Sequence, residues 1–144
     1  ITKYASQLMP NGGSIITLSY LGGERSVPNY NVMGVAKAAL ECSVRYLAAE
    51  YGSQDIRVNA ISAGPIRTLA AKGISGFDMI WKVNELRSPM KKNVSIDDVG
   101  NSGLYLCSDL SKGVTGETHH VDAGFHSVAV SKEDVKLIGK EITE

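Results

Sequence analysis

Tyr30 and Lys37 stand seven positions apart in a segment, residues 30–51, that no proline interrupts and that is rich in alanine. On an α-helix this spacing is close to two turns, so both side chains are expected on one face, about 10.5 Å apart along the axis. A phenol with its ordinary pKa of about 10 donates a hydrogen bond at neutral pH, and a neighbouring ammonium favours the phenolate. The pair could hold a ligand between an acid and a cation. A packed aromatic residue and a solvated lysine would show the same spacing.

Two strands are predicted on either side of this helix. Ser14–Ser19 is a β-rich run without polar alternation, which is typical of a parallel strand covered on both faces. The helix is expected to begin after a cap at Ser26 and to end at Gly52. Ile56–Ser62 is the second strand, and the turn Ala63-Gly64-Pro65 ends it. A β-α-β unit of this kind places ligands beyond the carboxyl ends of its strands.

The remaining segments predict an α/β fold with a doubly wound parallel sheet, Rossmann-like, in one domain. Residues 1–9 read as the tail of a helix without a start signal, so we expect the chain, 1–144, to be the carboxy-terminal portion of a domain whose amino-terminal βα units are missing. Residues 69–93 lack a clear period and fit a cover or two short helices. Ser95 begins a further helix, 116–122 forms a last strand, and 131–144 is a tail or a short helix.

Composition argues against two classes of partner. Fifteen lysines and arginines balance fifteen aspartates and glutamates, which argues against binding to nucleic acid or to an anionic membrane.

The cysteines and histidines do not indicate a metal site. Cys42 and Cys107 lack metal-ligand spacing and lie in apolar stretches, so buried free thiols are expected. His119 and His120 should face opposite sides of a strand and His126 is isolated, so no metal site is expected. A cytoplasmic protein is the default expectation.

The segment around the tyrosine and lysine resembles a known active site. The run from Ser19 to Ala38 is similar to the catalytic segment of enoyl-acyl carrier protein reductases, in which six residues separate the tyrosine from the lysine. Ordinary members of the short-chain dehydrogenase/reductase superfamily have only three residues between them, and here Gly34 occupies the position of their lysine. A second family tyrosine, ten residues before Tyr30, matches Tyr20.

Two further motifs follow in the same order as in that family. The run Arg57–Thr68 resembles the family's nicotinamide loop, and Gly116–Phe125 resembles its final strand. The resemblance covers residues 1–126 and is specific because three separated motifs agree. Without it, the turn after the second strand would be no more than a strand stop.

The resemblance implies roles for individual residues. Tyr30 would donate a hydrogen bond to the thioester carbonyl of an enoyl chain, and Lys37 would hold the nicotinamide ribose. Tyr20 would be the third catalytic residue, lining the acyl pocket or supporting the carbonyl, with simple core packing as its alternative. The implied cofactor contacts are Ser19, Lys37, Gly64, Pro65, Ile66, Thr68, Leu69 and Ala70. The implied substrate contacts are Tyr20, Tyr30, Met33, Ala70, Ala71, Ile74 and Phe77.

The implied activity is reduction of trans-2-enoyl thioesters on acyl carrier protein by a nicotinamide cofactor in type II fatty-acid synthesis, by a homotetramer. NAD is the implied cofactor, with NADH as the expected form. NADPH stays open because the residue that reads the ribose belongs to the first βα unit. Two alternatives remain. One is a short-chain dehydrogenase for a ketone or an alcohol, against which Gly34 speaks. The other is a dinucleotide-binding protein without turnover. Residues 69–77 could also form ordinary core helices instead of an acyl-chain cover.

Overall fold

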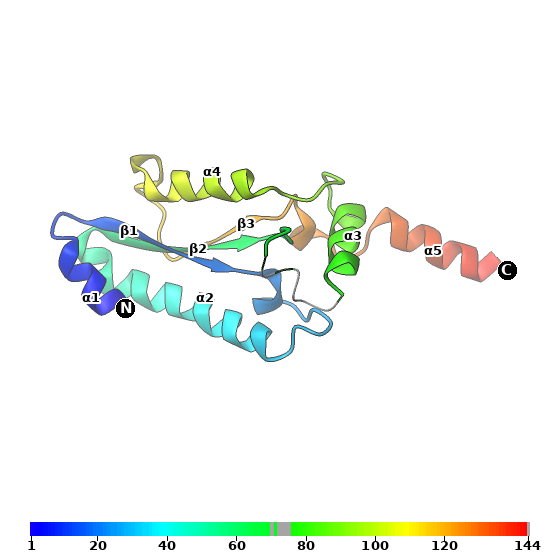
Figure 1. The fold of residues 1–144 in the computed structure, drawn as a ribbon, viewed down its shortest axis with the longest axis horizontal. Helices are drawn as coiled ribbons and strands as arrows, with labels where there is room; N and C mark the ends of the chain where they lie inside the picture. The colour runs from blue at the N-terminus through cyan, green and yellow to red at the C-terminus, as the bar shows by residue number, and fades with distance from the viewer. Residues whose placement is uncertain (70, 72–75, 144) are drawn as a thin grey trace.

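Three parallel strands form the centre of the computed structural model, which describes residues 1–69, 71 and 76–143. The strands are β1 (Gly13–Ser19), β2 (Ile56–Ala63) and β3 (Thr118–Val121), in the order β1-β2-β3. Their carboxyl ends point the same way (Figure 1). The segments that follow the strands therefore gather at one edge of the sheet, where the sequence predicts the site.

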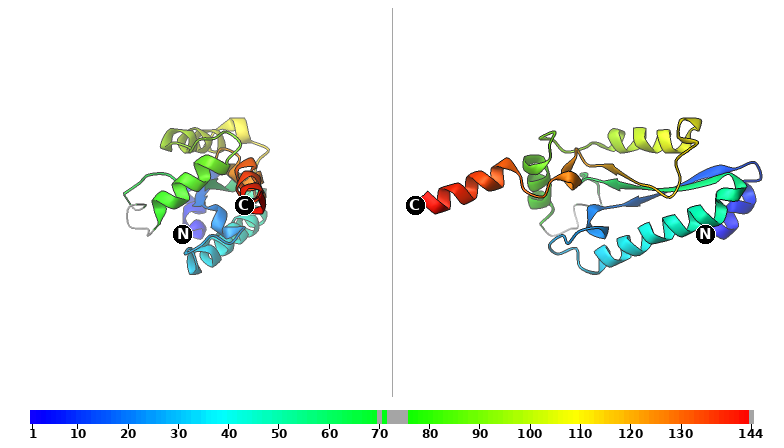
Figure 2. Two further views of the ribbon diagram at one scale, coloured as in Figure 1. Left: turned by 90° about the vertical axis from the view of Figure 1, so that its right-hand side faces the viewer. Right: turned by 180° about the vertical axis from the view of Figure 1, so that it is seen from behind.

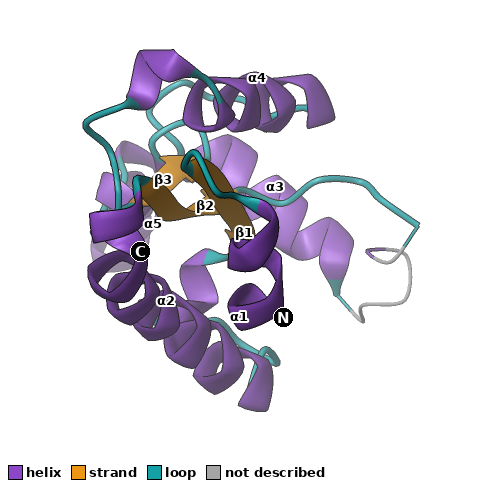
Figure 3. Cartoon of the chain, turned by 90° about the vertical axis from the view of Figure 1, so that its left-hand side faces the viewer, coloured by secondary structure: helices purple, strands orange, loops and turns teal. Residues whose placement is uncertain are grey.

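Helices cover both faces of this sheet. The long helix α2 (Val32–Tyr51) and the short α1 (Thr2–Ala5) lie on one face, and α4 (Ile96–Cys107) lies on the other (Figure 3). The core between α2 and the sheet consists of small and branched side chains, which let the helix lie close to the strands. Its buried members are Val44, Ala48, Ile56, Val58 and Ala60. This arrangement confirms the predicted α/β parallel-sheet class.

Several predicted boundaries are confirmed. Gly52 is the carboxy-terminal cap of α2, and both long strands agree with their predicted ranges to within one residue. Ser95 caps α4 through a capping box, in which the Asp98 amide donates to Ser95 Oγ over 3.1 Å and the Ser95 amide donates to Asp98 Oδ2 over 2.8 Å. These signals are local, so the sequence alone reveals them.

The predicted start of α2 is wrong. The helix begins at Val32 with Asn31 as its cap, so neither Ser26 nor Tyr30 belongs to it. Asn29 and Asn31 have φ values of 64° and 44°, and these left-handed residues turn the chain on both sides of Tyr30. Tyr30 therefore lies on a turn before the helix, and its position is set by that turn instead of by helical periodicity.

Residues 69–93 contain one described helix, α3 (Phe77–Arg87), which lies across the carboxyl end of the sheet (Figure 1). Two ion pairs join its end to α5 (Lys132–Thr143), between Arg87 and Asp134 at 2.6 Å and between Lys91 and Glu133 at 2.8 Å. The predicted short helix at the end of the chain is thus present, and it extends away from the sheet (Figure 2).

The expectation of buried thiols is wrong for one cysteine. Cys42 and Cys107 are both free, as predicted, but Cys107 is exposed at the end of α4 and Cys42 is only partly buried. An apolar stretch on an amphipathic helix has an outer face as well as an inner one, and Cys107 occupies the outer face. No helix within the described residues has the length and apolar character needed to cross a membrane.

Replacing Asn59 with alanine should lower the free energy of unfolding of the full-length protein by about 2 kcal/mol, because buried backbone groups lose their partners. The fully buried Asn59 side chain donates to the Val114 carbonyl over 3.0 Å and accepts from the Glu117 amide over 3.1 Å. Urea titration measures the change. Replacing Ser95 with alanine is the comparison and should cost about 1 kcal/mol as a lost helix cap; an equal or smaller effect at Asn59 would contradict the assignment.

Candidate active site

A cavity of about 300 Å³ opens at the carboxyl ends of β1 and β2. Its walls come from the segments that follow these two strands, from the start of α2 and from α3. The lining residues are Leu18, Ser19, Tyr20, Tyr30, Lys37, Ala63, Gly64, Pro65, Ile66, Thr68, Ala71, Phe77 and Ile80. The tyrosine, the lysine and the proline turn that the sequence singles out therefore face one space.

Tyr30 is held in the cavity wall by close packing. Its ring lies against Gly22, where an added Cβ would come within 2.3 Å of the Tyr30 Cδ1 atom, so a side chain at Gly22 would displace the phenol. The Tyr20 ring meets the Tyr30 ring edge to face, with centroids 5.0 Å apart and planes at 65°. This geometry is favourable for aromatic pairs and fixes the two phenols relative to each other.

Both phenols keep their protons at neutral pH. Burial raises the pKa of Tyr30 above its ordinary value, and burial together with the nearby Tyr30 raises the pKa of Tyr20. The expectation that an ammonium would favour the phenolate is therefore wrong, because the pKa of Tyr30 is raised and not lowered. The cause is the loss of water around the phenol, which disfavours the charged form. Tyr30 is consequently a hydrogen-bond donor.

Lys37 is fixed by the backbone of the neighbouring strand. Its Nζ atom donates to the Leu18 carbonyl over 2.8 Å, and the structure shows no ion pair of Lys37 with a carboxylate among the described residues. A carbonyl holds the ammonium without neutralising its charge. The full positive charge thus faces the cavity from the floor formed by the end of β1.

The loop after β2 leaves the β ladder at Pro65. Gly64 still continues the β ladder, since its amide donates to the Val121 carbonyl over 2.8 Å. Pro65 has no amide hydrogen, and the Ile66 amide donates to none of the residues that the structure describes. Thr68 Oγ1 accepts from the Ala71 amide over 3.2 Å, so this hydroxyl closes the loop. The Ile66 amide and the Lys37 ammonium line the same cavity, and both are donors that an acceptor group of a ligand could meet.

Most of the predicted site residues line this cavity, and a few do not. Met33 and Leu69 lie outside its walls, with relative exposures of 48% and 86%. Ala70 and Ile74 fall outside the described residues, and their predicted contacts stay predictions. The residues of the wall that the sequence did not indicate as contacts are Leu18, Ala63 and Ile80.

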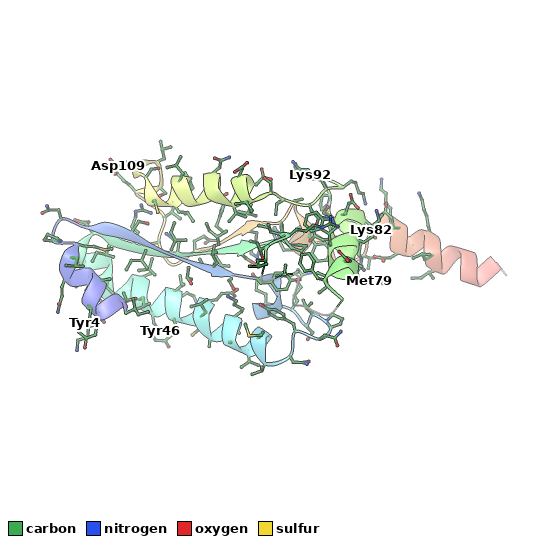
Figure 4. All side chains as sticks on the ribbon, viewed as in Figure 1. Tyr4, Tyr46, Met79, Lys82, Lys92 and Asp109 are labelled. Carbon is green, nitrogen blue, oxygen red and sulfur yellow. The ribbon has the colours of Figure 1, made fainter. Side chains whose placement is uncertain are left out.

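A second cavity, of about 380 Å³, lies on the other side of Tyr20 and Ile80, which line both spaces. It is bounded by the loop before α2, by Phe125 and by α3, including Met79, which Figure 4 labels. Most of its lining is apolar. The two cavities are therefore neighbouring compartments that share an aromatic and an aliphatic wall.

The histidines differ in part from expectation. His119 and His120 do face opposite sides, since the His119 ring approaches Tyr105 whereas His120 bonds Glu24 at 2.6 Å. His126 is not isolated, because its ring stacks on His120 at 4.0 Å and bonds Asp122. Within the described part of the chain, no group of three or more potential ligands is suited to a metal ion.

A parallel sheet covered on both faces, with a cavity at its carboxyl end, defines a Rossmann-like α/β protein. The family model described as enoyl-(acyl carrier protein) reductase matches residues 1–126. The chain belongs to this family, which confirms the resemblance seen in the sequence.

Individual relatives agree. An enoyl-acyl-carrier-protein reductase (NADH) of Rhizobium meliloti is 63% identical over 141 residues, 96% of this chain and 52% of the relative. A reductase (NADPH) of Staphylococcus aureus is 62% identical over 128 residues, 89% of this chain and 50% of the relative. The solved reductase of Anaplasma phagocytophilum in complex with NAD is 56% identical, with a TM-score of 0.86 over 93% of this chain and 49% of that one. The chain spans about half the length of the relatives it matches.

The two cavity phenols should titrate with midpoints above the ordinary tyrosine pKa of about 10 in the full-length protein, because burial raises their pKa values. Below the pKa that the two phenols have in the unfolded chain, both are neutral in the folded and in the unfolded protein. As the pH rises from that value to the higher pKa of the folded protein, mainly the unfolded chain loses these protons, so the free energy of unfolding falls. Alkaline difference absorbance of wild type against a Tyr20→Phe/Tyr30→Phe variant isolates their titration. A titration midpoint of this difference signal below the ordinary tyrosine pKa of about 10 would refute the burial argument.

Proposed function

We propose that the protein containing this chain reduces trans-2-enoyl thioesters carried by acyl carrier protein, using hydride from a nicotinamide cofactor, in type II fatty-acid synthesis. The observation that supports this proposal most directly is the convergence of Tyr30, Lys37 and the Pro65 turn on one cavity. The family of the chain supplies the substrate class.

The residues of the cavity suit a nicotinamide dinucleotide. The Lys37 ammonium can donate to the ribose hydroxyls, and the Ile66 amide, which donates to none of the described residues, can donate to the carboxamide oxygen. Gly64 lies close to Asp122, the residue that follows β3, and a Cβ added at Gly64 would come within 3.1 Å of the Asp122 Cα atom. The lack of a side chain at Gly64 therefore lets the loop pack directly against the end of β3. When bound, the cofactor supplies the hydride. NADH is our proposal; relatives of nearly equal identity carry NADH and NADPH in their names.

Tyr30 would act on the thioester. As a protonated phenol it donates a hydrogen bond to the thioester carbonyl, and this bond strengthens as negative charge develops on the oxygen of the enolate. Lys37 adds a positive charge on the same side of the cavity. Tyr20 supports the Tyr30 ring through the edge-to-face contact, so its part is to line the acyl pocket and hold the donor.

The acyl chain requires an apolar space beside the reacting carbons. Ala71, Phe77 and Ile80 provide it within the first cavity, and the second cavity continues it beyond Tyr20. Burial of each methylene contributes about 0.8 kcal/mol, so such a surface suits a fatty chain. Met33, Ala70 and Ile74 stay proposed contacts of the longer chain.

The same proposal extends to the substrate carrier, the location and the assembly of the protein. We propose acyl carrier protein as the substrate carrier, the cytoplasm as the location and a homotetramer as the assembly. The outer face of α2 supports assembly, because Val32, Val35 and Tyr46 are exposed there at 70–75% among small residues. An apolar helix face of this kind can pack against a second subunit.

The full-length protein should oxidise NADH in the presence of crotonyl thioester and leave β-ketoacyl thioester unreduced. The assay follows loss of NADH absorbance, with both substrates tested at equal concentration. Reduction of the ketoacyl substrate instead would favour the ketone-directed alternative. Cofactor binding without reduction of either thioester would favour a protein without turnover.

Tyr30→Phe should lower kcat about 100-fold, because one donor to the developing oxyanion is lost. Lys37→Ala should instead weaken cofactor binding, with a rise of about ten-fold or more in the Kd for NADH, because a charged hydrogen bond is lost. Steady-state kinetics and fluorescence titration separate the two effects. Lys82→Ala on α3, whose Nζ pairs with Glu85 at the surface, is the control and should change neither. Unchanged Kd and turnover in the Lys37 variant would refute its assigned role.

A further inference from the structure

A buried carboxylate on α2 has no part in the mechanism described so far. Glu41 has a relative exposure of only 6% and lies one helical turn after Lys37. Its Oε1 atom accepts a hydrogen bond from the hydroxyl of Ser19, the last residue of β1, which is itself 5% exposed. A charged group is buried at such a place only when its hydrogen bonds offset the loss of water.

The two helix side chains hold consecutive residues of the strand. Lys37 donates to the carbonyl of Leu18, and Glu41 accepts from the side chain of Ser19. Residues four apart on a helix share a face, so both contacts point from α2 to the same end of β1. Together they form a two-point clamp, defined by these four residues, between the helix and the cavity floor.

The short 3-10 turn Leu21–Gly23 closes the clamp from outside. An added Cβ at Gly23 would lie 2.8 Å from Glu41 Oε1 and 3.1 Å from the Ala38 amide nitrogen. The absence of a side chain there lets the turn lie directly on α2. The turn therefore covers the carboxylate and leaves it the Ser19 hydroxyl as the hydrogen-bond partner that the structure shows.

We propose that Glu41 is a positioning residue for Lys37. By fixing Ser19, Glu41 fixes the peptide that carries the Leu18 carbonyl, and this carbonyl holds the ammonium at its place in the cavity wall. The inference rests on the proposed function, because it assigns Glu41 to the reaction through the cofactor contact of Lys37. Loss of Glu41 should therefore weaken cofactor binding while the Tyr30 donor stays in place.

The experiment compares Glu41→Ala, Glu41→Gln and Ser19→Ala in the full-length protein, with the exposed Glu50→Ala of the same helix as control. Kd for NADH, KM for NADH, kcat and the free energy of unfolding are measured for each. Glu41→Ala should raise Kd and KM about ten-fold and change kcat less than about two-fold, since a charged hydrogen bond is lost. Glu41→Gln should stay within about two-fold of wild type, because its amide oxygen still accepts from Ser19.

A double-mutant cycle tests the clamp itself. Ser19→Ala removes the donor of the same hydrogen bond, so the Ser19→Ala/Glu41→Ala variant should bind NADH no more weakly than Glu41→Ala. If Glu41→Ala does not fold, Glu41→Gln and Ser19→Ala decide the question: wild-type Kd in the first and a raised Kd in the second support the clamp.

Three results would overturn the inference. They are a Glu41→Ala variant that keeps the NADH affinity of Glu50→Ala, a Glu41→Gln variant as impaired as Glu41→Ala, and additive effects in the cycle. Failure of the proposed function would give a different result, because wild type would then bind NADH without reducing an enoyl thioester. The comparison of the Kd for NADH between the Glu41 and Glu50 variants would still decide the role of Glu41. A wild type that binds neither NADH nor NADPH would overturn both.

Discussion

The attachment of α2 to the carboxyl end of β1 is the constraint from which the site follows. Lys37 reaches the Leu18 carbonyl and Glu41 reaches the Ser19 hydroxyl, so the helix cannot slide along the sheet without breaking both contacts. The buried face of α2 around Val44 and Ala48 sets the distance between helix and sheet. Apolar packing thus determines how close the two elements lie, and the polar contacts determine their register.

The same close approach explains the long spacing between the tyrosine and the lysine. An added Cβ at Gly34 would lie 2.7 Å from the Gly22 carbonyl oxygen, so the turn after β1 occupies the space that a lysine at position 34 would need. The nearest position of α2 that faces the strand end is one turn later, at Lys37. Tyr30 precedes α2, so the chain must pass the contact between Gly34 and Gly22 before it reaches Lys37. The additional residues between Tyr30 and Lys37 span this distance.

The parts of the structure that the sequence predicts are those with local causes. The two long strands, the end of α2 and the Ser95 cap depend on residues that are neighbours in the chain. The place of Tyr30 depends on the left-handed turns at Asn29 and Asn31, and asparagine on both sides of the tyrosine is the signal that could have indicated them. Nothing local indicates the wall residues Leu18 and Ile80, since the cavity joins segments that are distant in the chain, and Ala63 was indicated only as part of the turn that ends β2.

Strand register connects the interior of the sheet with the cavity. Ser19 pairs with Ser62 and Leu18 pairs with Ile61, so the segments after β1 and β2 leave the sheet at the same level. A slip of one residue would turn the alternating side chains of β2 to the opposite faces. Asn59 fixes the register of β2 against β3, because its buried amide bonds Val114 and Glu117 in the segment that leads into β3. A polar group in the middle of β2 thereby helps to fix the level at which the Pro65 turn leaves the sheet and enters the cavity wall.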